Sequence, residues 1–215
     1  MSKKIVFVTM FSLILSVSIF GQKKVEPKIF NVNLIKNGGA ETGNGEGWTN
    51  SDELKTFRYD GGWGDAWQVT PPNHGDYYFY ARVIKDTPIA EFTQKIDVSK
   101  IAQDIDANKV SYNLAGWYGI RGGAGVRLIL TFYGADGKRI KNSKDEEDAT
   151  EKFTSENRPS DVEMVEKRKS GQVPNGTRSI KITLEFSLFL IKDDNDGDMA
   201  LADNLSVVLT NKGDN

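Results

Sequence analysis

The sequence predicts an all-β fold in which the strands pack as a β-sandwich. After the N-terminal region, β-branched and aromatic residues recur in short stretches along most of the chain, and several stretches alternate polar with apolar residues. Such alternation is typical of strands that bury one face. Glycine-rich turn sequences separate the stretches. Several strands joined by such turns indicate a sandwich or a barrel.

Each expected element follows from its local composition. Residues 76–83 (DYYFYARV) are dense in β-forming residues, and residues 92–98 (FTQKIDV) alternate polar with apolar side chains. Residues 98–107 are the one stretch expected to form a helical turn, beginning at Ser99. Residues 141–169 are charged and are expected to form a long surface loop followed by a strand. The expected strands are residues 53–59, 76–83, 92–98, 109–118, 125–133, 178–186 and 199–209.

Two stretches at opposite ends of the chain are expected to lie side by side in the sandwich. Residues 33–48 (NLIKNGGAETGNGEGW) place an apolar pair before two adjacent glycines, and they end at Trp48. Adjacent glycines permit backbone shapes that other residues resist, and Trp48 is large enough to anchor one edge of the core. Residues 200–209 (ALADNLSVVL) form the matching stretch.

Composition limits the class of protein. The chain has 215 residues, 28 basic and 30 acidic side chains and a formal charge of -2. This near-neutral balance argues against a nucleic-acid partner, which a basic patch would serve. The absence of cysteine excludes disulfides, thiol catalysis, a thiolate zinc site and a lipoprotein anchor. We expect one β-sandwich binding domain over residues 31–211.

The N-terminus resembles a targeting segment. Lys3 and Lys4 precede an apolar run that ends near Gly21, which is typical of a signal peptide over residues 1–21. A membrane anchor is the alternative, but the apolar run is shorter than the ~20 residues that a membrane span needs. Residues 22–30 are expected to form a flexible leader. The sequence therefore predicts a protein that does not span a membrane and is secreted, periplasmic or displayed at the cell surface.

Two aromatic clusters are candidate ligand sites. Residues 59–67 (YDGGWGDAW) hold two tryptophans in a glycine-rich loop, where Trp63, Asp65 and Tyr59 are candidates for contact with a sugar. Aromatic rings stack on the C–H face of a pyranose while polar side chains fix its hydroxyls. The alternative is a packed loop without a ligand. In the second cluster, Tyr118 and Arg121 lead into a glycine pair and are expected to line a cleft.

The order of several motifs resembles that of galactose-binding-like jelly rolls, which include bacterial carbohydrate-binding modules and the F-box-associated sugar-recognition domains. The motifs are NLIKNGGAETGNGEGW, HGDYYFY, FTQKIDVS, VSYNLAGWYGIRGG, RKSGQVPNGTRSIKITLEF and ALADNLSVVL. The resemblance implies an antiparallel jelly roll, a structural calcium ion and a polysaccharide or other glycan as ligand. The last loop departs from the F-box-associated pattern, because it carries acidic residues and Met199 where those domains have aromatics.

The resemblance also implies which residues hold the calcium. Glu41 follows the glycine pair and Asp203 lies in the last strand, where the acids of similar modules share the ion with nearby carbonyls. Carboxylate and carbonyl oxygens are the ligands that calcium prefers. Asn37, Gly39 and Asp76 are weaker candidates. The alternative is that Asp203 hydrogen-bonds to the opening turn and Glu41 is solvated.

A second acidic segment is interpreted as a turn. Residues 193–198 (DDNDGD) resemble an EF-hand loop, but the spacing puts Lys192 at the position where an acid is required.

The sequence favours a non-catalytic module over an enzyme. The single histidine, His74, lies in a turn, and no nucleophilic triad can be assembled around it. Asp60 and Asp65 would be the pair to test in a glycosidase. The prediction is therefore a secreted carbohydrate-binding module with a structural calcium. The alternatives are a cell-surface adhesion protein that binds a protein partner and, third, a polysaccharide-degrading jelly roll.

Overall fold

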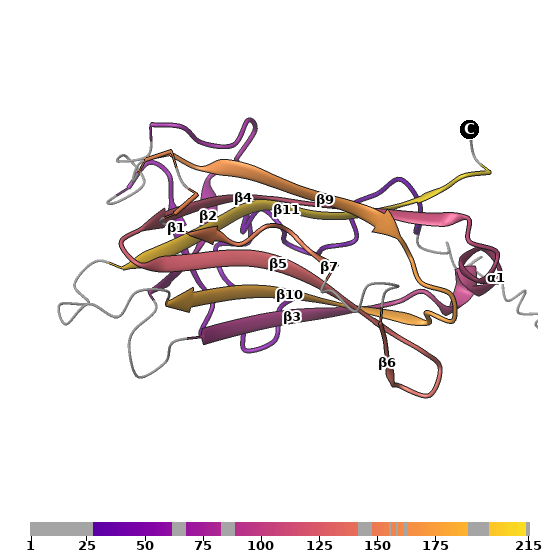
Figure 1. The fold of residues 1–215 in the computed structure, drawn as a ribbon. Coiled ribbons are helices and arrows are strands. Elements are labelled where there is room, and N and C mark those ends of the chain that lie inside the picture. Colours follow the sequence, from indigo (N-terminus) through magenta and orange to yellow (C-terminus); the bar gives the residue numbers. More distant parts are fainter. Residues whose placement is uncertain are drawn as a thin grey trace, which may run out of the picture.

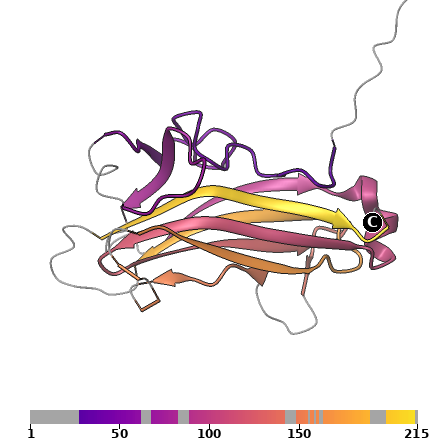
Figure 2. The same cartoon turned by 90° about the horizontal axis from the view of Figure 1, so that it is seen from above.

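Two antiparallel sheets face each other across a hydrophobic core (Figures 1 and 2). The structure, a computed structural model, describes residues 28–61, 68–82, 89–141, 148–154, 156–157, 159–160, 163–188 and 198–213. The predicted β-sandwich is confirmed, and each of the seven expected strands overlaps an observed one.

The first sheet has the strand order β1-β2-β11-β4-β9 within the described residues. Its central strands, β11 and β4, pair along nearly their whole length, with a register shift between Asp203 and Ser206. The strands are β1 (Lys55–Arg58), β2 (Tyr77–Arg82), β11 (Met199–Asn211), β4 (Val110–Arg121) and β9 (Val165–Gln172).

The second sheet has the order β3-β10-β5-β6, and two further short strands, β7 and β8, also pair with β5. Its strands are β3 (Ile89–Asp97), β10 (Ser179–Leu188), β5 (Ala124–Tyr133), β6 (Arg139–Ile140), β7 (Asp148–Ala149) and β8 (Phe153–Thr154).

A short helical segment follows β3, as predicted. A 3-10 turn, η2 (Ser99–Ile101), runs into α1 (Ala102–Asp106) at one end of the sandwich (Figure 1). The helix is anchored from its last residue, because Asp106 accepts hydrogen bonds from the Gly176 amide at 2.9 Å and from the Arg178 guanidinium.

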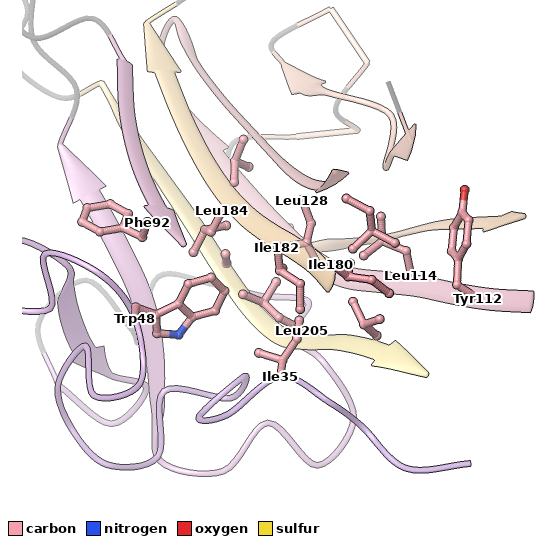
Figure 3. Packing of buried hydrophobic residues seen from close by; sticks show 14 of the residues in the cluster. Ile35, Trp48, Phe92, Tyr112, Leu114, Leu128, Ile180, Ile182, Leu184 and Leu205 are labelled. Carbon is pink, nitrogen blue, oxygen red and sulfur yellow. The ribbon is translucent and has the colours of Figure 1, made fainter. Parts of the chain in front are cut away.

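The core lies between the inward faces of the two sheets (Figure 3). Leu114 from the first sheet and Leu128, Ile182 and Leu184 from the second are almost fully buried. Burial of one such side chain contributes roughly 1.5–3 kcal/mol. Trp48 is 5% exposed and packs edge-on against Phe79, with ring centroids 5.9 Å apart. The prediction that Trp48 anchors the core is confirmed.

The stretches at residues 33–48 and 200–209 lie side by side, as the sequence predicts. The Leu34 amide donates to the Val207 carbonyl at 2.8 Å, and the Leu205 amide donates to the Gly38 carbonyl at 2.9 Å. The Asn33 side chain strengthens this pairing, because its amide nitrogen donates to the Leu205 carbonyl at 2.9 Å.

The strand predicted at the end of residues 141–169 is confirmed, because β9 begins at Val165, but the predicted surface loop before it differs from the prediction. The described part of this stretch includes β7 and β8, and Thr150 and Phe153 are buried. The Thr150 hydroxyl donates to the Tyr118 hydroxyl at 3.3 Å, which ties the segment to the core. Because charged residues make up most of this stretch of sequence, burial of its few inward-facing residues was not predicted.

The predicted signal peptide and most of the predicted leader lie outside the described residues. The helices of the described ranges are all too short to cross a membrane.

Candidate functional site

The outer face of the first sheet carries a cluster of aromatic residues. Side chains alternate between the two faces of a strand, so Trp117 of β4 points outward while Tyr118 points into the core. Phe57 and Tyr80 project to the same outer face from β1 and β2. These three side chains, which we call the aromatic face, are all partly exposed, and Phe57 is 37% exposed.

A buried apolar cluster lies beside the aromatic face on the same side of the sheet, since Tyr78 is opposite Phe57 and Leu201 is opposite Tyr80 in the strand ladders. Tyr80 and Trp117 pack against a small apolar cluster separate from the main core, and Phe57 contacts Tyr80 edge-on, with ring centroids 5.0 Å apart. Phe57 also stacks on Tyr78 at 6.4 Å. The aromatic rings are therefore held in fixed orientations. The supporting cluster consists of Tyr59, Tyr78, Met164, Met199 and Leu201.

Polar and charged side chains border the aromatic face. In the ladder between β4 and β9, Trp117 is opposite Glu166, and the next outward position pairs Ala115 with Arg168. Arg121 lies at the far end of β4 and is exposed. A row of apolar rings flanked by hydrogen-bonding groups has the composition of a ligand-binding surface.

The structure corrects two of the predicted sugar contacts. Tyr118 is fully buried, because it occupies an inward position of β4, so the prediction that it lines a cleft is wrong. Tyr59 is 9% exposed, and its ring is covered by His74 and Tyr78, with centroids at 3.9 and 4.8 Å. Tyr59 therefore belongs to the supporting cluster and is too buried to stack on a sugar.

Trp63 and Asp65 lie outside the described residues, so their role stays a prediction. The described residues on both sides of that segment reach the aromatic face. Tyr59 belongs to the supporting cluster, and the Val69 carbonyl accepts a hydrogen bond from the amide of Met164, another member of the cluster, at 2.9 Å.

Three of the five predicted metal ligands come together near the opening turn. A Cβ atom on Gly39 would lie 3.6 Å from Glu41 Cγ and 3.7 Å from both Asp203 Oδ1 and Asn204 Oδ1. The side-chain oxygens of Asp203 and Asn204 and the Cγ atom of Glu41 therefore surround the position that a side chain at Gly39 would occupy. Gly75 closes on the same group, because a Cβ there would lie 2.4 Å from the Glu41 carboxyl carbon.

The two acids also have hydrogen-bond partners within the protein. Glu41 accepts hydrogen bonds from the backbone amides of Asp76 at 2.8 Å and Tyr77 at 3.1 Å, so it holds the start of β2. Asp203 accepts from the Tyr59 hydroxyl at 2.9 Å and from the Asn204 amide at 2.6 Å. Each carboxylate oxygen accepts one of these bonds and keeps a second lone pair.

Asn37 and Asp76 take other roles. The Asn37 side chain donates to the carbonyls of Asn44 and Glu46 at 3.0 and 3.3 Å and accepts from the Thr42 amide, which closes the glycine-rich turn. Asp76 contributes its backbone amide to Glu41, while its residue is exposed.

Electrostatics make Asp203 unusual. Burial raises its pKa to about 8; the hydrogen bonds from Asn204 and Tyr59 oppose this increase, and the nearby Glu41 charge adds to it. Burial and the Asp203 charge also raise the pKa of the Tyr59 hydroxyl, which keeps that phenol protonated. The charge of Glu41 thus disfavours the ionisation of Asp203, an arrangement that a divalent cation would relieve.

The donors present fit a calcium ion in kind. Glu41, Asp203 and Asn204 offer hard oxygen atoms beside a backbone turn, and calcium mixes such ligands with carbonyls. In the part of the chain that the structure describes, no group of three acidic, histidine or cysteine side chains forms a ready-made metal cluster. Any ion here would draw on carbonyl oxygens as well.

Comparison with solved structures supports the fold of the chain alone. The enzymatically active domain of tailspike protein 4 from bacteriophage CBA120 is 18% identical with a TM-score of 0.52; the match covers 83% of this chain and 21% of that one. The chain has the β-sandwich fold. It spans about a fifth of the length of that tailspike chain.

More distant structural neighbours include modules that bind carbohydrate. The CBM22-1 xylan-binding domain of Paenibacillus barcinonensis Xyn10C is 13% identical with a TM-score of 0.41, over 86% of this chain and 99% of that one. The CBM22-1–GH10 modules of Clostridium thermocellum Xyn10B are 14% identical with a TM-score of 0.42, over 77% and 26% of the two chains. No protein family model and no curated protein sequence matches the chain.

Phe57, Tyr80 and Trp117 were not among the predicted ligand residues. The signal that could have found them is the two-residue period of the strands. Tyr80 and Trp117 each sit one position from a residue that packs in the main core, Phe79 and Tyr118 respectively.

Proposed function

We propose that this protein is a non-catalytic carbohydrate-binding module whose glycan lies across the aromatic face. The observation that carries the proposal is the placement of Phe57, Tyr80 and Trp117, partly exposed, on one side of a single sheet and beside the buried supporting cluster. Aromatic rings held rigid in this way give large contact area at little entropic cost.

The described acid of the pair considered for catalysis is held in an ion pair. Asp60, one of the two acids considered for catalysis, is paired with Arg58 through contacts of 2.6 and 2.7 Å. The hydrogen bond from Arg58 lowers the pKa of Asp60, which makes it a poor general acid. The Tyr59 hydroxyl, with its raised pKa, is equally unsuited to act as a base.

We further propose that Glu41 and Asp203 hold a structural calcium ion together with Asn204 and neighbouring carbonyls. The support is that the side-chain oxygens of Asp203 and Asn204 both lie 3.7 Å from the position that a Cβ atom would take at Gly39, beside the Glu41 side chain. A bound ion would cross-link the opening turn to β11, and it would have no part in chemistry. Export by the signal peptide over residues 1–21 completes the proposal, and sequencing of the secreted protein should find an N-terminus near Gln22.

A glycan array tests the binding function. The purified wild-type protein should bind one class of glycan, and Trp117→Ala should lose most of that binding while keeping the far-ultraviolet circular dichroism of the wild type. The matched control is Tyr133→Ala, which removes a partly exposed aromatic from β5 of the other sheet. Equal binding by Trp117→Ala and the wild type would contradict the proposal, as would a folded wild-type protein that binds no glycan.

A further inference from the structure

A shallow hollow with a cationic border continues from the aromatic face along β4 and β9. It has a volume of about 190 Å³ and is lined by Asn113, Leu114, Arg168, Lys169 and Ser170. This volume is below the ~300 Å³ of a site for a whole drug-sized ligand. The hollow is therefore suited to a single substituent of a larger ligand.

The register of the two strands shows which side chains border the hollow on the outer face. Asn113 is opposite Ser170 and Ala115 is opposite Arg168, and both pairs lie on the same side of the sheet as Trp117. Leu114 is opposite Lys169, and Leu114 is buried in the core. Strand alternation directs Lys169 away from the outer face, so Arg168 is the cation that faces a ligand there.

The spacing links this hollow to the aromatic face. The Ala115–Arg168 pair is two residues from Trp117 along β4, or about 7 Å at the usual rise of a strand. Ala115 is a small side chain between the indole and the hollow. An oligosaccharide stacked on Trp117 could therefore place its next ring, or a substituent of it, beside Arg168.

Arg168 presents a group that recognises anions. Its side chain is 71% exposed, and Nη2 lies 2.5 Å from Glu166 Oε1, which is 30% exposed on the same face. The planar guanidinium binds carboxylate and sulfate oxygens through paired hydrogen bonds. Glu166 thus already occupies the position on the guanidinium that an anionic group of a ligand would take. On the other side of Trp117, Arg121 adds a second positive charge at the end of β4.

We propose that the glycan bound by this face is anionic, with its carboxylate or sulfate group held by Arg168 in the hollow beside Asn113 and Ser170. This inference rests on the proposed function, because Trp117 has to bind the sugar ring. A ligand anion would displace Glu166 from the guanidinium. Glu166 and the anionic group of the ligand therefore compete for the Arg168 guanidinium. Because of this competition, substitution of Arg168 should weaken binding of the ligand and substitution of Glu166 should strengthen it.

Affinity electrophoresis tests the proposal with three probes: polygalacturonate, which carries carboxylates; chondroitin sulfate, which also carries sulfates; and a neutral xylan. The wild type should be retarded by at least one anionic probe more strongly than by xylan, and retardation should weaken as salt rises. Arg168→Gln should weaken binding to that probe about tenfold, and Glu166→Gln should strengthen it. Arg139→Gln, an exposed arginine on β6, is the matched control and should change nothing.

The outcomes separate this proposal from the function on which it rests. Equal retardation by neutral and anionic probes, or an Arg168→Gln variant that binds as well as the wild type while Trp117→Ala does not, would overturn the anionic ligand and keep the carbohydrate-binding face. Binding that survives Trp117→Ala but is lost in Arg168→Gln would contradict both, since it would indicate general ion exchange. Circular dichroism of each variant checks that it is folded.

Discussion

Trp117 and Tyr118 are adjacent in the chain and lie on opposite faces of the first sheet. Trp117 packs against the supporting cluster, while the ring of Tyr118 is fully buried in the main core and its hydroxyl accepts a hydrogen bond from Thr150. One strand position thus separates the proposed ligand surface from the interior.

This separation predicts different results for two neighbouring substitutions. Trp117→Ala should reduce glycan affinity by at least about tenfold, or ~1.4 kcal/mol, with a smaller loss of stability than its neighbour. Tyr118→Ala should lower the free energy of unfolding by about 3–5 kcal/mol, as is usual for truncation of a buried aromatic. Urea denaturation and glycan titration measure the two effects. The reverse assignment, with binding lost only in the Tyr118 variant that is still folded, would refute the proposed surface.

Calcium should raise the melting temperature of the wild type, and a chelator should reverse the increase. At a concentration 100 times the dissociation constant, a ligand that binds only the folded state adds about 2.7 kcal/mol. Glu41→Gln and Asp203→Asn should each abolish most of the increase, because each removes a carboxylate from the group around Gly39. Asp136→Asn, in an exposed turn after β5, should respond to calcium like the wild type. A wild-type melting temperature unaffected by calcium would count against the metal site.

Acid should weaken the protein through a buried carboxylate on the second sheet. Glu185 is 5% exposed and lies 3.0 Å from Lys152 Nζ and 2.9 Å from Arg127 Nη2. Burial alone would raise its pKa, but the hydrogen bonds from Arg127 and Lys152 outweigh burial and lower the pKa below its usual 4.5. Since the folded state lowers this pKa, its contribution to stability is present above pH 4.5 and is lost as pH falls through the folded value.

Glu185→Gln should therefore cost about 2 kcal/mol at pH 7, less than the ~3–5 kcal/mol of a fully buried pair because both cations are partly exposed. The variant should also lose less stability than the wild type between pH 5 and pH 3. Chemical denaturation across this range measures both quantities. Parallel pH profiles for the two proteins would show that another group controls the acid response.

The pairing of the chain ends depends on Gly38. A Cβ atom there would lie 2.2 Å from the carbonyl oxygen of Leu205, the residue whose amide donates to Gly38. Gly38→Ala should therefore lower the free energy of unfolding by at least ~2 kcal/mol, because backbone atoms must shift to relieve the clash. The matched control is Gly61→Ala, because among the described residues no atom beyond its chain neighbours lies within 4 Å of an added Cβ. Thermal melting of both variants tests the difference, and a neutral Gly38→Ala would exclude this contact as a constraint on the fold.

More of the fold than of the candidate site could be predicted from the sequence. The two-residue alternation located the strands, and the motifs at residues 33–48 and 200–209 predicted that these two stretches lie side by side. Both signals can be recognised within short stretches of sequence. The site depends on which strands become neighbours. Phe57, Tyr80 and Trp117 come from β1, β2 and β4, and β11 from the end of the chain separates β2 from β4. Tyr118 was predicted to line a cleft although it faces the core, because a motif shows that aromatics are present and leaves open which face each one takes.

The meeting of the chain ends has a consequence for how the sandwich can be built into larger assemblies. Phe30 bridges to Leu209, and both ends of the described chain lie near α1, at the opposite end of the sandwich from β1 and β2 (Figures 1 and 2). Chain ends this close allow a domain to be inserted into a surface loop of a host protein, or to be circularly permuted. An engineer could join the two ends, reopen the chain at the Gly134–Lys138 turn, and keep the aromatic face turned away from both new attachment points.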